Sequence, residues 1–153
     1  MSREIWGPKI WFILHRISFF SDRTDIVCAW IRMLKDLHEI IPCSLCKEHM
    51  GKYCIEHPIR RAIITGFKGI NVKKAIIQWC YQFHNTVNRD KGAQNFNKEN
   101  LELFYGYGNR NEMIADVNRT VEEIEKLWKK VPMRNFKESL RYLLGLISGG
   151  TFD

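Results

Sequence analysis

Apolar residues recur along most of the chain at spacings of three and four, which is the period of an amphipathic helix. The first such stretch runs from Ile10 to Phe20, and Pro8 suits the first turn of that helix. A second stretch begins near Thr24 and continues to Ile41. Few segments alternate apolar and polar residues as half-buried strands do, so the pattern predicts an all-α fold.

Proline and glycine mark the boundaries of the later elements. Because Pro42 cannot continue the second helix, it places Cys43 at or just inside the start of a third, which Pro58 closes. Gly66 and Gly69 then indicate a loop. The segments predicted beyond Pro42 are helices at Cys43–Glu56, Val72–Asn88, Glu112–Val131 and Asn135–Ile147, a loop at Asp90–Asn97, a helical turn at Lys98–Tyr105, and a frayed tail at Ser148–Asp153.

A chain of 153 residues, of which 45% are hydrophobic, suits one domain with one core. Its net charge of +7 is spread out, with no run of five or more basic residues, so we expect no nucleic-acid partner, which would need a clustered basic patch. The longest apolar stretch, Ile10–Phe20, is interrupted by His15 and Arg16 and falls short of the ~18 residues of a membrane span. We therefore expect no membrane partner.

Five cysteines are present, and only Cys43 and Cys46 have a motif-like spacing. Two intervening residues on the first turn of a helix bring the two sulfurs within disulfide range. The positive end of the helix lowers the pKa of a cysteine thiol and favours thiol–disulfide exchange. The pair is therefore a candidate redox-active disulfide, while Cys28, Cys54 and Cys80 are first interpreted as small buried hydrophobes.

A lone C-x-x-C is also consistent with half of a zinc site, which needs four ligands. Cys80 and His84 are four apart on one helix face and form the plausible other half. A zinc-stabilised helical binding module using Cys43, Cys46, Cys80 and His84 is therefore the alternative function, and a non-catalytic basic adaptor is a third. A thioredoxin-like site would need alternating strands and helices, which the pattern lacks.

The fourth predicted helix carries an aromatic and amide-rich face. It consists of Trp79, His84, Asn85 and Asn88. Such a face is costly to bury unless something polar fills it, and an isoalloxazine or adenine ring would do so. The other interpretation is that these side chains are solvated or paired within the core. Trp11 and His15 are also four apart, but residues in that setting more often belong to a core than to a ligand site.

Four segments match, in order, the motifs of one enzyme family. They are Gly7-x-x-x-Trp11-x-x-Leu14-His15, Pro42-Cys43-Ser44-Leu45-Cys46, Cys54-x-x-His57-Pro58, and Trp79 followed by His84-Asn85-Thr86-Val87-Asn88. Together they resemble the Erv/ALR family of FAD-dependent sulfhydryl oxidases, over about Glu4 to Tyr105. The combination of P-C-x-x-C and H-N-x-V-N at this distance is specific, and it favours the oxidase over the zinc module.

The resemblance implies an FAD-binding core at residues 1–105, built as a four-helix bundle with a short fifth helix. Residues 106–153 are then expected to form a helical C-terminal extension packed on the core. By resemblance, Cys46 lies against the flavin and Cys43 faces incoming thiols, and both are catalytic. The implied reaction makes disulfides in protein dithiols and passes electrons through FAD to O2, giving H2O2, with no resident metal.

The resemblance also assigns residues to the cofactor. Those expected around FAD are Gly7, Trp11, His15, Tyr81, His84, Asn85, Val87 and Asn88. Where the chain departs from the family, contact with the phosphates is expected from Lys91 or Arg89, and Tyr105 replaces the tryptophan that stacks on adenine. Lys98 stands where the family has a cysteine, so Cys80 is expected to lack a structural disulfide.

The chain has no second C-x-x-C to act as a shuttle. Its compact core resembles the versions encoded by large DNA viruses. The expected partners are O2 and a dithiol protein, with a thioredoxin-like protein as one candidate, and a homodimer is expected because family members are commonly dimers. The expected location is the cytoplasm, that of the host if the protein is viral, with the mitochondrial intermembrane space as the alternative.

Overall fold

The computed structural model describes residues 2–69 and 71–149, and only the backbone of 66–69. Every regular element in this part is helical, as the pattern predicts. The α-helices are α1 (Arg3–Ser18), α2 (Val27–Ile40), α3 (Ser44–Glu56), α4 (Ile59–Gly69), α5 (Val72–Asp90), α6 (Leu101–Tyr105), α7 (Arg110–Leu127) and α8 (Arg134–Ile147). Short 3₁₀ turns at Thr24–Ile26 and Lys98–Asn100 precede α2 and α6. Residues 150–153 of the predicted tail lie outside this description.

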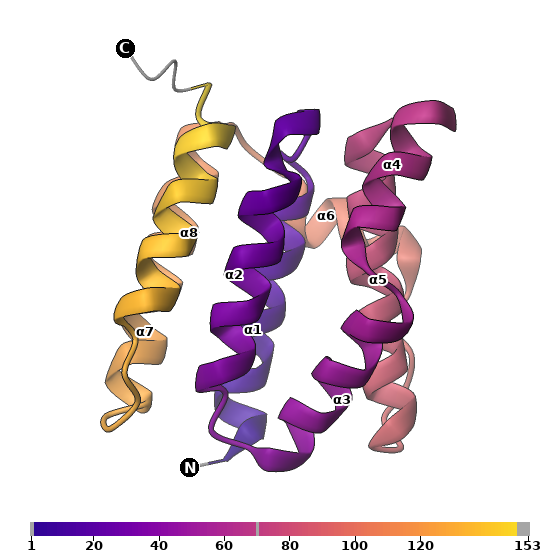
Figure 1. The fold of residues 1–153 in the computed structure, drawn as a ribbon. Coiled ribbons are helices and arrows are strands. Elements are labelled where there is room, and N and C mark those ends of the chain that lie inside the picture. Colours follow the sequence, from indigo (N-terminus) through magenta and orange to yellow (C-terminus); the bar gives the residue numbers. More distant parts are fainter. Residues whose placement is uncertain (1, 70, 150–153) are drawn as a thin grey trace.

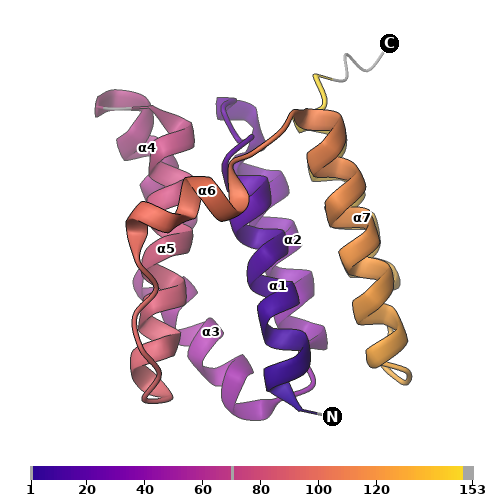
Figure 2. The same cartoon turned by 180° about the vertical axis from the view of Figure 1, so that it is seen from behind.

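Helix α1 lies in the middle of the molecule, with α5 and α6 on one side and α7 on the other (Figure 2). It begins earlier than predicted because Ser2 caps it, accepting a hydrogen bond at Oγ from the Glu4 N–H at 3.2 Å. Pro8 consequently lies inside the helix and not in its first turn. Every side chain of Ile13–Ser18 is buried, so the C-terminal part of α1 is enclosed on all faces and not on one apolar stripe, whereas Ile5 near its start is 54% exposed.

Helix α4 replaces the loop that Gly66 and Gly69 indicated in the sequence. Ile59 and Ile63, four apart, are both buried, and the helix packs along α5 (Figure 1). This tertiary packing outweighs the low helix propensity of glycine. Pro58 therefore closes α3 and directly precedes a further helix.

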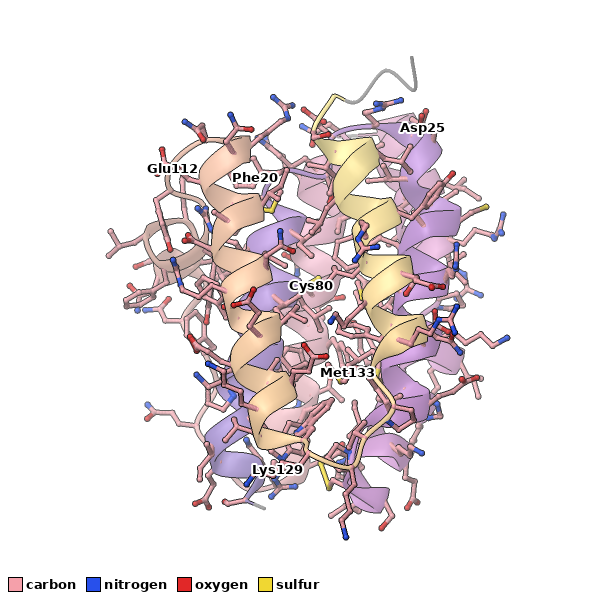
Figure 3. The ribbon with its side chains drawn as sticks, turned by 90° about the vertical axis from the view of Figure 1, so that its left-hand side faces the viewer. Phe20, Asp25, Cys80, Glu112, Lys129 and Met133 are labelled. Carbon is pink, nitrogen blue, oxygen red and sulfur yellow. A yellow bond between two sulfur atoms is a disulfide. The ribbon has the colours of Figure 1, made fainter. Side chains whose placement is uncertain are left out.

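The C-terminal helices form a hairpin that packs on the other side of α1 and α2. Helix α8 runs along α2 and α7 along α1, and the turn between them carries Lys129 and Met133 (Figure 3). Trp128 of this hairpin meets Trp6 of α1 edge to face, with ring centroids 5.1 Å apart. Both belong to the single buried cluster that forms the core. None of the helices described is both long and apolar enough to span a bilayer.

Truncating a buried leucine of the hairpin should destabilise the whole protein. Leu143 is 0% exposed, so Leu143→Ala should lower the free energy of unfolding by about 2–5 kcal/mol. Leu103→Ala is the matched control, because that side chain is 72% exposed and its loss should change stability by less than about 0.5 kcal/mol. Urea unfolding followed by circular dichroism measures both. Similar small losses would show that the hairpin does not belong to the cooperative core.

Candidate functional site

The two motif cysteines form a disulfide at the start of α3, with Cα atoms 5.2 Å apart. Cys43 is the extended N-cap residue of the helix, and its Sγ accepts a hydrogen bond from the Cys46 N–H at 3.2 Å. An amide that the helix start would otherwise leave unpaired is thus directed at Cys43. The same donor would stabilise a thiolate on Cys43, so this sulfur is suited to thiol exchange.

A cavity of about 440 Å³ lies between α1, α2, α3 and α5 and reaches the loop after α5. Much of its wall is apolar, with Ile10, Trp11, Leu14, Leu37, Met50 and Phe83. Cys46 lines the cavity, whereas Cys43 is not among its lining residues, and Leu45 between them is 51% exposed. Cys46 therefore borders a partly open, mainly apolar pocket.

Five aromatic rings from four segments of the chain pack together beside the cavity. They are Trp11, His15, His84, Phe96 and Tyr105. The rings of Trp11 and His84 are stacked nearly parallel, with centroids 4.2 Å apart and an interplanar angle of 9°, and Tyr105 stacks on His15 at 4.7 Å. Phe96 completes the cluster at 5.6 Å from His84. Helices α1, α5 and α6 thus converge on flat aromatic surfaces that suit a planar heteroaromatic ligand.

Within this cluster, Nε2 of His15 and Nδ1 of His84 share a hydrogen bond of 2.8 Å. Burial lowers the pKa of His15 to about 3, and His84 acts in the same direction. Burial, with the Lys91 ammonium, lowers the pKa of His84 to about 4. Both rings are therefore neutral at pH 7, and a single proton lies between them. Nδ1 of His15 is buried with no hydrogen-bond partner in the described part of the chain, and a bound ligand or water would satisfy it.

Two buried asparagines hold the loop after α5. Oδ1 of Asn85 accepts a hydrogen bond from the Phe96 N–H at 2.8 Å, and the carbonyl of Asn88 accepts one from the Ala93 N–H at 2.7 Å. Gly92 reverses the chain with a φ of 73°, a conformation that favours glycine. Asn85 therefore contributes to the ring cluster by positioning Phe96.

Arg16 is fully buried and anchors the segment after α6 to α1. Its Nη1 donates to the carbonyl of Tyr105 at 3.0 Å and to that of Tyr107, and its Nη2 donates to Asp116 at 3.2 Å. The guanidinium also lies 3.9 Å from the centre of the Tyr107 ring. By holding the Tyr105 carbonyl, Arg16 keeps the Tyr105 ring against His15.

Most residues expected around a cofactor lie in the cavity or in the adjoining ring cluster. Gly7, Trp11, Val87 and Lys91 line the cavity, and His15, His84 and Tyr105 join Trp11 in the ring cluster. Tyr81, half-buried on α5, belongs to neither, and Arg89 is exposed and donates to Thr86.

The sequence interpretation missed Arg3 and Phe96. Arg3 lines the cavity, and its Nη1 lies 3.8 Å from Cys46 Sγ. Extending the first helix back to Ser2 would have placed Arg3 one turn before Gly7, on the same face. Phe96 belongs to a loop, so helical spacing gives no signal for it, and the available signal was its place in the segment that replaces the family's K-P-x-F.

The structure does not support the zinc alternative. Cys43 and Cys46 are bonded to each other, and His84 pairs with His15. Across residues 2–69 and 71–149, no three or more histidine, cysteine or acidic side chains gather as a metal site would require.

Cys80 is a buried free thiol in the interior (Figure 3), as the lysine at the family's cysteine position predicts. Burial raises its pKa, and raises that of Cys54 to about 11, so both thiols stay protonated at neutral pH.

Residues 8–105 match the profile of the Erv1 / Alr family. Among curated proteins, the FAD-linked sulfhydryl oxidases of the Pig/Kenya and Tick/Malawi isolates of African swine fever virus are each 30% identical to this chain over 87 residues. The matched region is 55% of this chain and 66% of each relative, just under two thirds of the viral proteins' length. No solved structure matches the chain significantly.

Replacing Arg16 by Met should lower the free energy of unfolding by about 3–5 kcal/mol, because Asp116 and two carbonyls lose their buried donor. Arg119→Met is the matched control. It removes the other ion pair of Asp116, made by a side chain that is 63% exposed, and should change stability by less than about 1 kcal/mol. Urea unfolding measures both variants. Equal small losses would contradict the anchoring role of Arg16.

Mild acidification should destabilise the protein through the histidine pair. The pKa of both rings is lower in the folded protein than the ordinary 6.5, so the unfolded chain binds more protons once the pH falls below about 6.5. Between pH 6.5 and 5, the fully buried His15 should lower the free energy of unfolding by about 1–2 kcal/mol. His15→Gln should flatten this dependence, measured by urea unfolding at each pH. The same slope in that variant would exclude His15 as the cause.

Proposed function

Because the chain belongs to the Erv1/Alr family, we propose that it is an FAD-dependent thiol oxidase that makes disulfides in protein dithiols. The observation that carries this proposal is the Cys43–Cys46 disulfide, whose second cysteine lines a cavity walled by aromatic and aliphatic side chains. The names of the viral relatives, FAD-linked sulfhydryl oxidases, support the same activity.

The residues around the cavity fit FAD. A volume of about 440 Å³ is within the range of ligand pockets, and walls such as Trp11, Leu14 and Phe83 suit the planar isoalloxazine ring. Lys91 offers a cation for the phosphates, and the unsatisfied Nδ1 of His15 leaves a polar atom in the ring cluster. The cofactor contacts proposed for this chain are Gly7, Trp11, His15, His84, Asn85, Val87, Asn88, Lys91, Phe96 and Tyr105. Tyr81, which lies outside the cavity and the ring cluster, is proposed on the family resemblance alone.

The chain's own part in the reaction begins at Cys43. A substrate thiolate attacks Cys43 Sγ and forms a mixed disulfide, while the Cys43–Cys46 bond breaks and its electron pair stays on Cys46. The second substrate thiol then attacks the mixed disulfide, which releases the oxidised substrate and leaves a Cys43 thiolate held by the Cys46 N–H. Because the chain has no second C-x-x-C, the substrate dithiol reacts with Cys43 directly.

The Cys46 thiolate lies beside the cavity, whose walls are mainly apolar. FAD held there would supply a two-electron acceptor for the Cys46 thiolate and a route on to dioxygen, with hydrogen peroxide as the product. The Cys43 thiolate would then re-form its bond to Cys46. The residues of the cavity and the ring cluster orient the cofactor for this transfer.

The proposal extends to assembly and location. A homodimer in the cytoplasm of a host cell is supported by the dimers common in the family and by the viral origin of the relatives. Because α7 and α8 pack against α1 and α2, the faces of α1 and α2 that they cover are not available for pairing. Light scattering of the purified protein tests the assembly, since one chain has a mass of 18.2 kDa and a dimer twice that. A mass of one chain would contradict the dimer.

The purified protein should be yellow, contain FAD and consume dioxygen when given a dithiol. Cys46→Ser should reduce turnover to background while retaining FAD, because serine keeps the size of the side chain and removes the sulfur. Cys28→Ser is the matched control, since Cys28 is an exposed free thiol. Oxygen-electrode assays and the visible absorption spectrum measure these effects. A colourless protein that stays inactive after FAD is added would refute the proposed function.

A further inference from the structure

Arg3 approaches the cavity-facing sulfur of the disulfide from another helix. Its Nη1 lies 3.8 Å from Cys46 Sγ, so the contact joins the first turn of α1 to the first turn of α3. One turn further on, the Arg3 side chain lies beside Gly7 at an ordinary van der Waals distance. A Cβ placed on Gly7 would meet, within 4 Å among the described atoms, only Arg3 Cγ at 3.8 Å. The Arg3 side chain therefore passes over Gly7 toward Cys46.

The two sulfurs have different hydrogen-bond donors. The N–H of Cys46 is directed at Cys43 Sγ, so the hydrogen-bond donor at the start of α3 is used by Cys43. The donor to Cys46 Sγ is the Arg3 guanidinium. A neutral disulfide sulfur accepts hydrogen bonds weakly, whereas a thiolate attracts a cation strongly. The Arg3 contact should therefore strengthen when the disulfide opens.

A second feature of Arg3 is that its guanidinium has no carboxylate partner among the described residues. Throughout the part of the chain that the structure describes, Arg3 takes part in none of the ion pairs. Glu4, the acidic residue next to it, is exposed and also lines the cavity, as does Lys91, a second cation. The guanidinium therefore lies at the edge of a mainly apolar cavity with a sulfur as its described polar contact.

We propose that Arg3 is a catalytic residue that stabilises the Cys46 thiolate released when a substrate opens the disulfide. In that step the bond between the substrate sulfur and Cys43 Sγ forms and the Cys43–Cys46 bond breaks. The electron pair of the broken bond stays on Cys46 Sγ, beside the guanidinium. A thiol that is more stable as a thiolate is a better leaving group, so Arg3 speeds the opening of the disulfide. This inference rests on the proposed function, which supplies the attacking thiol.

The test uses the FAD-loaded Cys43→Ser protein, in which Cys46 is an unpaired thiol. The pH dependence of its alkylation by iodoacetamide, followed by peptide mass spectrometry, reports the thiolate fraction. Arg3→Met in this background should reduce the thiolate fraction at a fixed pH below the midpoint by about tenfold or more, as expected when an opposite charge ~4–6 Å away is lost. Arg3→Lys should lie between the two.

Arg60→Met is the matched control, because Arg60 is exposed on α4 and its loss should leave the alkylation profile unchanged. Arg3→Gln is a second neutral variant if Arg3→Met does not fold, as judged by circular dichroism. FAD content is measured in parallel by absorbance. An unchanged profile overturns the proposal, and an unchanged profile with loss of FAD would make Arg3 an anchor for the phosphates instead. Since alkylation needs neither turnover nor oxygen, this outcome is separate from a failure of the oxidase activity.

Discussion

Enclosure of helix α1 by its neighbours is the constraint on which the rest of the structure depends. All side chains of Ile13–Ser18 are buried, so each polar one must find a hydrogen-bond partner within the fold, and only Ser18 finds one on α1 itself. His15 consequently pairs with His84 of α5, and Arg16 holds the segment after α6 together with Asp116 of α7. These pairings fix α5 and the Tyr105 ring beside α1, so they contribute both to stability and to the geometry of the ring cluster.

The second constraint is the break at Pro42. Proline ends α2, and the next residue becomes the extended N-cap of α3, which directs the Cys46 N–H at Cys43. Cys46, in the first turn of α3, lines the cavity, whereas Cys43 does not. Two cysteines three positions apart therefore have different surroundings. Their proposed roles, Cys43 toward the substrate and Cys46 toward the cofactor, follow from this difference.

The sequence predicts much of the fold because hydrophobic spacing and proline act locally. The helical class, the start of α3 and the turn at Lys98–Tyr105 all follow from such signals, and the structure confirms them. Helix α4 was missed because its formation depends on packing along α5. The low helix propensity of glycine favours a loop there and gives no information about that packing. Arg16 and Phe96 were missed for a similar reason, since their roles depend on partners far away in the chain.

The central claim is that Cys43 faces the substrate while Cys46 faces the cavity. The most direct test compares how fast a small aromatic disulfide reagent forms a mixed disulfide with each cysteine alone, Cys43 in the Cys46→Ser protein and Cys46 in the Cys43→Ser protein, both loaded with FAD. Our account predicts that Cys43 reacts at least about tenfold faster, because its sulfur lies outside the cavity and has a helix-start donor. Equal rates, or a faster reaction at Cys46, would contradict it.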